Sequence, residues 1–292
     1  MDEKKRWTNE AVLRESGRWV HVPAGCALVE DAERLMVHPP EFRGTSRVWR
    51  SWPARHAAED LILKTVQEVC ASGGERLVWH TGDAVSPPFM DGLLSRHGFE
   101  KTEDLEVLAF ELGDGPRPML PRLDVPAEIR ATPARNGAEL EEAHAIASRV
   151  FPNSPPLSEP EVRAYLRGIE RVTRQPDAGG GACEFRFLAL LRDPAREEEA
   201  IATAGAQVVG ETVRLWGAGT LAEYRRRGAY GALVVERCRL AHALGATLAL
   251  TKANEATSAP LLRNAGFRTI ASERRHALQT SHQAPIPQPP AQ

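Results

Sequence analysis

Apolar and polar residues recur along the chain in two periods, and each period predicts one kind of element. Apolar residues at 140, 143, 146, 147 and 150 have the spacing of one helix face, so we expect a helix over Ala138–Val150. The sequence predicts further helices over 57–70, 88–96, 229–244 and 254–264. Short apolar runs predict strands over 77–80, 105–110, 128–131, 183–191, 200–209, 212–219, 247–251 and 269–278.

Capping signals mark the start of two helices. The side-chain oxygen of Asn136 can accept a bond from the first turn of the helix that follows it. Ser158 is followed by Glu161 at the third helical position, a pair in which each side chain bonds the backbone N–H of the other. We therefore expect a second helix from about Ser158 to Glu170.

The order helix, strand, helix, strand occurs twice, and Leu94–Phe99 mirrors Leu262–Phe267. A Pro- and Gly-rich segment over 113–121 separates the two copies. The chain is thus expected to form an N-terminal domain over 1–115, a linker over 116–127 and a C-terminal domain over 128–278. Residues 279–292 contain four prolines and no apolar pattern, which predicts a disordered tail.

Bulk composition excludes several classes of function. The 292 residues are 42% hydrophobic with a net charge of −2, so neither a nucleic-acid partner nor an anionic membrane partner is expected. No apolar run approaches the roughly 18 residues of a membrane-spanning helix, and the first residues do not form a secretory signal. The four cysteines lack CxxC spacing and the nine histidines form no cluster, so we expect no metal and a cytoplasmic location.

The segment Gly219–Gly231 carries the most specific chemistry. It joins a strand to a helix through Arg225, Arg226, Arg227 and Gly228. Backbone N–H groups at a helix start have no internal partners, and the helix dipole favours negative charge there. Gly228 removes a Cβ that would keep an anion from the backbone, and arginines add charge-assisted bonds. The segment is therefore predicted to bind phosphate.

These residues resemble the GCN5-related N-acetyltransferases (GNAT). In that family a strand runs into Arg/Gln-x-x-Gly-x-Gly/Ala and then a helix, and Arg225 and Gly228 match the first part. Tyr230 departs from the final Gly/Ala, although Gly231 follows at once. The later strand, helix and Ala265-Gly266-Phe267 ending extend the resemblance over 208–278. It implies an α+β fold, the GNAT acyl-CoA N-acyltransferase fold, in two domains that each have a mostly antiparallel sheet flanked by helices.

The resemblance also implies acetyl-CoA as co-substrate. The residues that it implies for binding acetyl-CoA are Gly219, Thr220, Leu221, Arg225, Arg226, Arg227, Gly228, Ala229, Tyr230, Gly231, Asn254 and Ser258. A backbone N–H near Thr220 or Leu221 would polarise the thioester carbonyl. Asn254 has a helix cap as its alternative role, and Ser258 has simple packing.

The first half resembles a degenerate copy. Its corresponding turn, Trp52–Ala58, has no glycine in the place of Gly228 and keeps only Arg55 and His56. We expect this half not to bind the cofactor and to form one wall of the acceptor site.

A general base is harder to assign. Many members of the family place a glutamate on the fourth strand and a tyrosine in the last helix, but Leu262 stands at the tyrosine position. Glu211 and Tyr230 are the candidates for catalysis, with a turn residue and a packing residue as their alternatives. Water can also take the proton of the amine, with positioning supplying most of the rate.

The resulting hypothesis is an acetyl-CoA-dependent N-acetyltransferase for a small-molecule or peptide amine. The alternative is a catalytically silent acyl-CoA-binding or regulatory protein of the same fold. A third function, nucleic-acid binding through Arg225–Arg227, conflicts with the near-neutral net charge. The sequence does not identify the acceptor, and a homodimer stays open.

Overall fold

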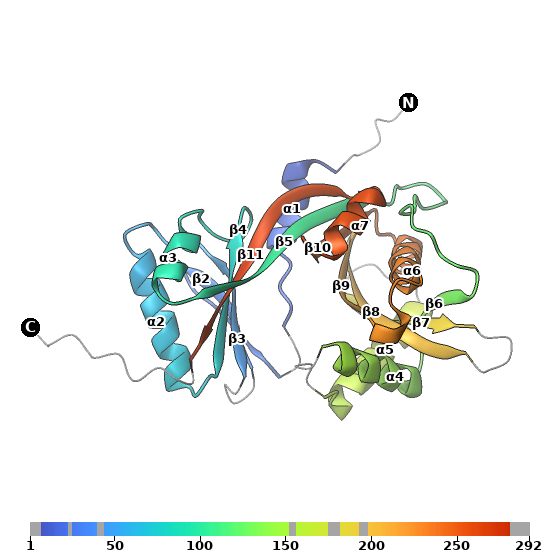
Figure 1. Ribbon diagram of the computed structural model, residues 1–292, viewed down its shortest axis with the longest axis horizontal. Helices are drawn as coiled ribbons and strands as arrows, with labels where there is room; N and C mark the ends of the chain where they lie inside the picture. Colours follow the sequence, from blue (N-terminus) through green and yellow to red (C-terminus); the bar gives the residue numbers. More distant parts are fainter. Residues whose placement is uncertain are drawn as a thin grey trace, which may run out of the picture. The chain divides into compact units, whose positions relative to one another are not determined.

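The computed structural model describes residues 7–22, 25–39, 44–151, 156–174, 182–192 and 198–280. The fold is α+β, with mostly antiparallel strands (Figure 1). The helices are α1 Asn9–Gly17, α2 Ala58–Ala71, α3 Met90–Arg96, α4 Gly137–Val150, α5 Glu159–Arg174, α6 Ala229–Ala243 and α7 Ser258–Asn264. The strands are β1 Ala27–Glu30, β2 Arg34–His38, β3 Thr45–Ser51, β4 Arg76–Gly82, β5 Glu100–Glu111, β6 Ile129–Pro133, β7 Cys183–Leu191, β8 Glu199–Val209, β9 Thr212–Thr220, β10 Leu248–Asn254 and β11 Arg268–Gln279.

These elements form two compact units, which we name after the half of the sequence that dominates each. The C-terminal unit holds residues 7–12, Leu108–Lys252 and Pro260–Thr269. The N-terminal unit holds Leu13–Val107, Ala253–Ala259 and residues 270–280.

The sheet of the C-terminal unit has the order β10-β9-β8-β7-β6. Its β6 to β9 are antiparallel neighbours, whereas β9 and β10 are parallel because α6 connects them. Helix α4 buries Ala143 and Ile146 against Leu188, Ala200 and Leu221. Helix α6 covers the other face of β6–β9 (Figure 1).

The sheet of the N-terminal unit has the order β1-β2-β3-β4-β11. Helices α2 and α3 cover it through a core that includes Ile62, Leu94, Trp79 and Leu278. Here β3 and β4 are parallel and joined by α2, as β9 and β10 are joined by α6. The predicted internal repeat is therefore present in the structure.

The units are not consecutive stretches of chain. Strand β11 follows α7 in the second half, yet its residues from Ile270 belong to the N-terminal unit, where they pair with β4. Strand β5 conversely extends from the N-terminal unit into the C-terminal unit at Leu108. Each strand has 12 residues, about 40 Å of extended chain, and so can serve both units. The sequence instead predicts contiguous domains over 1–115 and 128–278.

Most predicted elements lie within two residues of those observed. The cap of α4 is confirmed, because Asn136 Oδ1 accepts from Glu139 N at 2.9 Å. The helix predicted over 254–264 is present, but it begins four residues later than predicted: Asn254 ends β10 and α7 begins at Ser258. The predicted end of the second early helix at Glu170 is also short, because α5 continues to Arg174. Gly179-Gly180-Gly181, which predicts a turn before β7, and the tail beyond 280 lie outside the described residues.

Candidate functional site

Strands β9 and β10 pair over only part of their lengths. The register runs from Thr212 opposite Leu248 to Leu215 opposite Thr251. The last link is the Thr251 hydroxyl, which donates to the carbonyl of Leu215 at 3.0 Å. Strand β9 then continues for five residues, to Thr220, past Leu215, the last residue that it pairs with β10. One edge of this stretch of β9 is therefore available to a ligand.

A β-bulge lies where the pairing ends. Trp216 is opposite Gly205 and Gly219 is opposite Thr203, so that Gly217 and Ala218 together oppose Ala204. Gly217 has a φ of +58°, a left-handed conformation that glycine adopts at little cost. The extra residue redirects the backbone beside the open edge.

The backbone N–H groups at the end of β9 point alternately toward β8 and away from it. The N–H of Leu221 donates to the carbonyl of Ile201 at 3.0 Å, so of the two residues predicted to polarise the thioester carbonyl, Thr220 or Leu221, Thr220 is left as the candidate. Neighbouring residues in an antiparallel strand point their N–H groups to opposite sides. We therefore expect the N–H of Thr220, opposite Ala202, to face the open edge.

The turn after β9 has the backbone geometry of an anion site. Arg226 has a φ of +64° and Gly228 a φ of +86°, and α6 begins at Ala229. The bond from Ala232 N to Gly228 O, at 3.0 Å, opens the helical ladder, so the preceding N–H groups have no carbonyl one helical turn back. The first turn of α6 has no acidic residue, and Gly228 caps it without a side chain. The positive end of α6 can thus receive an anion.

The linker packs against this turn. A Cβ on Gly228 would lie 2.4 Å from Pro126 Cδ, and one on Gly231 would lie 3.2 Å from the carbonyl oxygen of Asp124. The glycine at 228 therefore allows the linker to approach, which differs from the predicted reason that it allows an anion to approach. We still expect phosphate to be bound by the backbone N–H groups at the start of α6.

Arg225, Arg226 and Arg227 are exposed. Arg225 Nε donates to the carbonyl of Thr220 at 3.4 Å, which ties the turn back to β9. Arg226 and Arg227 have no acidic partner among the described residues, and Glu223 pairs with Arg149 at 2.9 Å instead. Two guanidinium groups thus remain beside the uncapped helix end.

Gly219 allows a helix to approach the strand. A Cβ there would lie 2.6 Å from Val150 Cγ1 and 3.1 Å from Phe151 Cε2, at the end of α4. The face of β9 toward α4 is therefore filled at Gly219. An extended ligand such as pantetheine would have to follow the open edge of the strand.

Asn254 and Ser258 belong to the N-terminal unit. The Oδ1 atom of Asn254 accepts from Ala256 N at 3.1 Å and from the Thr257 hydroxyl at 3.2 Å. Its Nδ2 atom donates to Glu103 Oε1 at 3.3 Å. The side chain thus shapes the turn between β10 and α7, and the cofactor role of both residues stays a prediction.

The two candidates for catalysis fare differently. Glu211 lies in the β8–β9 turn, just before the nine-residue β9 begins. A strand rises about 3.3 Å per residue, so the length of β9 separates Glu211 from the Arg225–Gly228 turn by roughly 25 Å. We correct this prediction: Glu211 is a turn residue. Tyr230 is half-buried in the first turn of α6. Burial lowers the pKa of Arg237 and the nearby Tyr230 raises it. The role of Tyr230 in catalysis stays a prediction.

The corresponding place in the N-terminal unit is closed. Strands β3 and β4 pair from Thr45 opposite Arg76 to Val48 opposite Trp79. Beyond that point the ring of Trp49 stacks on His80 with centroids 4.5 Å apart. Ser51 N donates to the carbonyl of Val85 at 2.8 Å, and Trp79 Nε1 donates to Ser51 Oγ at 3.1 Å.

The charge at the start of the connecting helix also differs. The first turn of α2 contains Glu59 and Asp60, which would repel a pyrophosphate, whereas α6 has no acid there. The sequence had indicated the degeneracy through the missing glycine. The stacked rings are an interaction that no local pattern would have identified.

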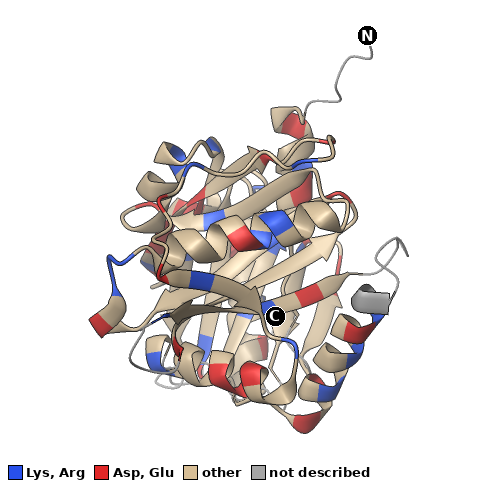
Figure 2. Ribbon diagram, turned by 90° about the vertical axis from the view of Figure 1, so that its right-hand side faces the viewer, with Lys and Arg blue, Asp and Glu red and all other residues tan. Residues whose placement is uncertain are grey.

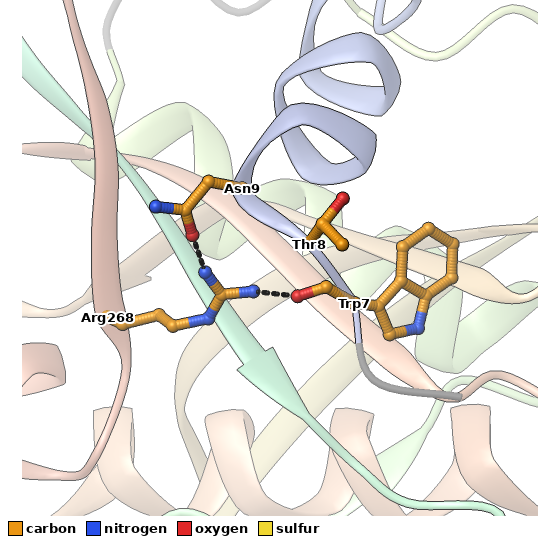
Figure 3. A pocket seen from close by; sticks show the side chains of 4 residues that line it. All are labelled: Trp7, Thr8, Asn9 and Arg268. Carbon is orange, nitrogen blue, oxygen red and sulfur yellow. Dashed lines mark hydrogen bonds between the residues drawn. The ribbon is translucent and has the colours of Figure 1, made fainter. Parts of the chain in front are cut away.

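Two surface hollows lie away from the turn. Trp7, Thr8, Asn9 and Arg268 line one of about 290 Å³ (Figure 3). There Arg268 donates to the carbonyl of Trp7 at 2.7 Å and to Asn9 Oδ1, which fastens residues 7–9 to the C-terminal unit. A hollow of about 810 Å³ lies between Met119 and Gly266. Neither includes a residue of 217–231, because that site is an open strand edge.

A charged surface, a metal site or a membrane-spanning helix among the described residues would each indicate another class of function. Basic and acidic residues are interspersed over the visible elements (Figure 2), in line with the net charge of −2. Within the described residues no group of His, Cys, Asp and Glu is arranged to hold a metal ion. No helix in the described part of the chain is long and apolar enough to cross a membrane.

Comparison with known proteins identifies the fold. No family model and no curated protein matches the sequence. A GCN5-related N-acetyltransferase from Kribbella flavida is 20% identical with a TM-score of 0.60, over 87% of this chain and 89% of that chain. One from Sphaerobacter thermophilus is 16% identical with a TM-score of 0.59, over 85% and 81%.

A tandem GNAT protein from the clavulanic acid biosynthesis pathway is similar over 93% of this chain and 89% of its own, at 14% identity and a TM-score of 0.54. Identities this low support the fold alone. The fold is therefore that of the GCN5-related N-acetyltransferases in a tandem arrangement.

Proposed function

We propose that this protein is an N-acetyltransferase that transfers the acetyl group of acetyl-CoA to an amine, with acetyl-CoA bound by the C-terminal unit. One observation carries the proposal. The left-handed residues Arg226 and Gly228 precede a helix that has no side-chain cap and no acid in its first turn, directly after a strand with an open edge. A pyrophosphate and an extended thioester arm need these two features side by side.

Each part of the turn has a separate role in this proposal. The N–H groups of residues 228–231 bind the pyrophosphate, and Arg226 and Arg227 add charge. The pantetheine arm follows the open edge of β9 past Thr220. An N–H at the bulge or at Thr220 stabilises the negative charge that develops on the thioester oxygen as the amine attacks.

Proton removal needs no dedicated carboxylate in this scheme. Glu211 lies in the turn at the far end of β9 and Leu262 is a buried leucine, so in this proposal the amine loses its proton to water. Holding amine and thioester in contact supplies most of the acceleration. We propose, in addition, that the N-terminal unit binds no acetyl-CoA, because Trp49 and His80 stack where the arm would lie.

Turnover tests the proposal. Purified protein is incubated with acetyl-CoA and a panel of primary amines, and acetylated products are measured by mass spectrometry. We expect at least one product whose formation saturates with acetyl-CoA. Arg226→Glu should lower kcat/KM for acetyl-CoA about tenfold or more, because a carboxylate would replace a cation at the pyrophosphate.

The alternative is a silent protein that binds acyl-CoA without turnover. The buried Leu262, in the place where the family has a tyrosine, favours it. Saturable acetyl-CoA binding with no product from any amine would establish this alternative. Absence of acetyl-CoA binding would reject both.

A further inference from the structure

Trp216 provides a flat surface beside the proposed acyl site. It is the last residue of β9 before the bulge at Gly217 and Ala218. A Cβ on Gly205, its partner on β8, would lie 2.4 Å from the indole ring. The ring therefore lies flat across the sheet, in space that only a glycine leaves open.

Arg186 covers this ring. It lies on β7 opposite Gly205, and its guanidinium carbon is 4.1 Å from the centroid of Trp216. Stacking of a planar guanidinium on an indole is favourable and leaves the N–H groups at the guanidinium edge free to bond. A cation from β7 is thus held over β9, next to the bulge.

Helix α5 holds the strand that carries Arg186. The backbone N–H of Arg186 donates to the hydroxyl of Tyr165 at 3.0 Å, and that hydroxyl donates to the carbonyl of Ala134 at 2.8 Å. Burial raises the pKa of Tyr165 to about 12, so its proton stays in place. The backbone that carries Arg186 is therefore fixed by α5, whereas the guanidinium itself is held by Trp216.

A carboxylate already contacts this cation. Glu184 Oε1 lies 3.1 Å from Arg186 Nη2, and the two side chains are 37% and 28% exposed. Burial raises the pKa of Glu184, with Arg186 acting against it. Because both side chains are partly exposed, a second carboxylate can approach Arg186 from solvent and compete with Glu184 for it.

We propose that Arg186 binds the carboxylate of the acceptor, and that the acceptor is a free amino acid acetylated on its amine. This inference rests on the proposed function. Gly217 and Ala218 lie only about 3–7 Å further along β9 than Trp216, at about 3.3 Å per residue. A carboxylate on the guanidinium would hold an amine one or two bonds away beside the thioester. Amines with no carboxylate, or with a distant one, would gain nothing from Arg186.

Matched pairs of acceptors test the inference. Leucine is compared with isopentylamine, phenylalanine with phenethylamine, and lysine with cadaverine, each at saturating acetyl-CoA. At least one amino acid should have a kcat/KM at least tenfold above that of its decarboxylated partner. Arg186→Met should lower that kcat/KM about tenfold to a hundredfold, the value of hydrogen bonds to a charged group, and should change kcat/KM for the decarboxylated amine far less.

Two further variants separate charge from structure. Arg186→Lys keeps the cation and should retain part of the preference, and Glu184→Gln should lower KM for the amino acid severalfold because the competing carboxylate is gone. Arg192→Met is the matched control, since Arg192 follows the same strand and also pairs with a glutamate, Glu198, at 2.8 Å. It should change neither rate, and an acetyl-CoA titration of each variant checks the fold.

The outcomes distinguish the two proposals. Faster turnover of the decarboxylated amines, or an Arg186→Met variant with unchanged preference, would overturn the amino-acid inference and leave the acetyltransferase standing. Turnover of no amine at all would overturn both, with acetyl-CoA binding then marking a silent protein.

Discussion

At the scale of single residues, Gly228 satisfies two constraints at once. Its φ of +86° is a conformation that costs other residues about 1–2 kcal/mol, and its missing Cβ admits Pro126. Arg226 adopts a left-handed φ of +64° without being a glycine. Such strain in a turn persists where the surrounding structure holds it, and it clusters at ligand sites.

Gly228→Ala therefore should do more than strain its own backbone. We expect it to displace Pro126 or the turn, to lower the thermal midpoint and to weaken acetyl-CoA binding by tenfold or more. Gly245→Ala is the control, because Gly245 has a φ of +87° but nothing within 4 Å of a Cβ. It should cost only about 1 kcal/mol of stability and leave binding intact. Equal binding losses in both variants would argue against a specific role for Gly228.

Residue chemistry was predictable from the sequence only where it is local. The spacing of Arg225 and Gly228 indicated an anion site, and the structure gives that turn left-handed residues and an uncapped helix. Three other features depend on residues far along the chain. They are the approach of Pro126 to Gly228, the bond from the N–H of Leu221 to Ile201, and the stacking of Arg186 on Trp216. No local pattern encodes them.

At the scale of elements, a polar network ties α3 to the sheet of the N-terminal unit. Asp91 accepts from the Thr81 hydroxyl and from His276 Nε2 at 2.9 Å, and it pairs with Arg274 at 2.9 Å. Burial acts to raise the pKa of Asp91, but the bonds from Thr81 and His276 and the charge of Arg274 outweigh it and lower the pKa.

Asp91→Asn should lower the free energy of unfolding of the protein by about 1–3 kcal/mol at pH 7. A lowered pKa in the folded state stabilises above the ordinary value of 3.8, and this contribution is lost as the pH falls through the folded pKa. The difference between variant and wild type, from denaturant titrations, should shrink towards pH 3. Asp104→Asn, which breaks an exposed pair with Lys101, should cost at most about 1 kcal/mol. A pH-independent difference would contradict the electrostatic explanation.

Periodic elements were predictable because their pattern is local. Strand β7 has the predicted bounds, and α2, α4 and α6 lie within one residue of theirs. The first elements, α1 and β1 to β3, were not predicted. They are 4–9 residues long, and their burial does not follow polarity: β2 is buried throughout although it contains Arg34 and His38. Their apolar pattern is therefore too weak to predict them.

At the scale of the whole molecule, the same strand–helix–strand unit occurs twice, but the end of its first strand is open in one copy and covered in the other. In the C-terminal unit β9 continues past its pairing with β10 beside a turn of exposed arginines. In the N-terminal unit Trp49 and His80 stack past the pairing, and Glu59 and Asp60 occupy the helix start. The exchange of β5 and β11 between units could not be predicted from the sequence, because strand pairing over such separations leaves no local signal.

Calorimetric titration of acetyl-CoA into the whole chain measures directly whether one half binds and the other does not. We expect one site per chain. Binding should be lost in Arg226→Glu/Arg227→Glu and kept in Arg55→Glu, the matching change at the N-terminal turn. Two sites per chain, or a loss with Arg55→Glu instead, would contradict the assignment of the C-terminal unit as the cofactor-binding half.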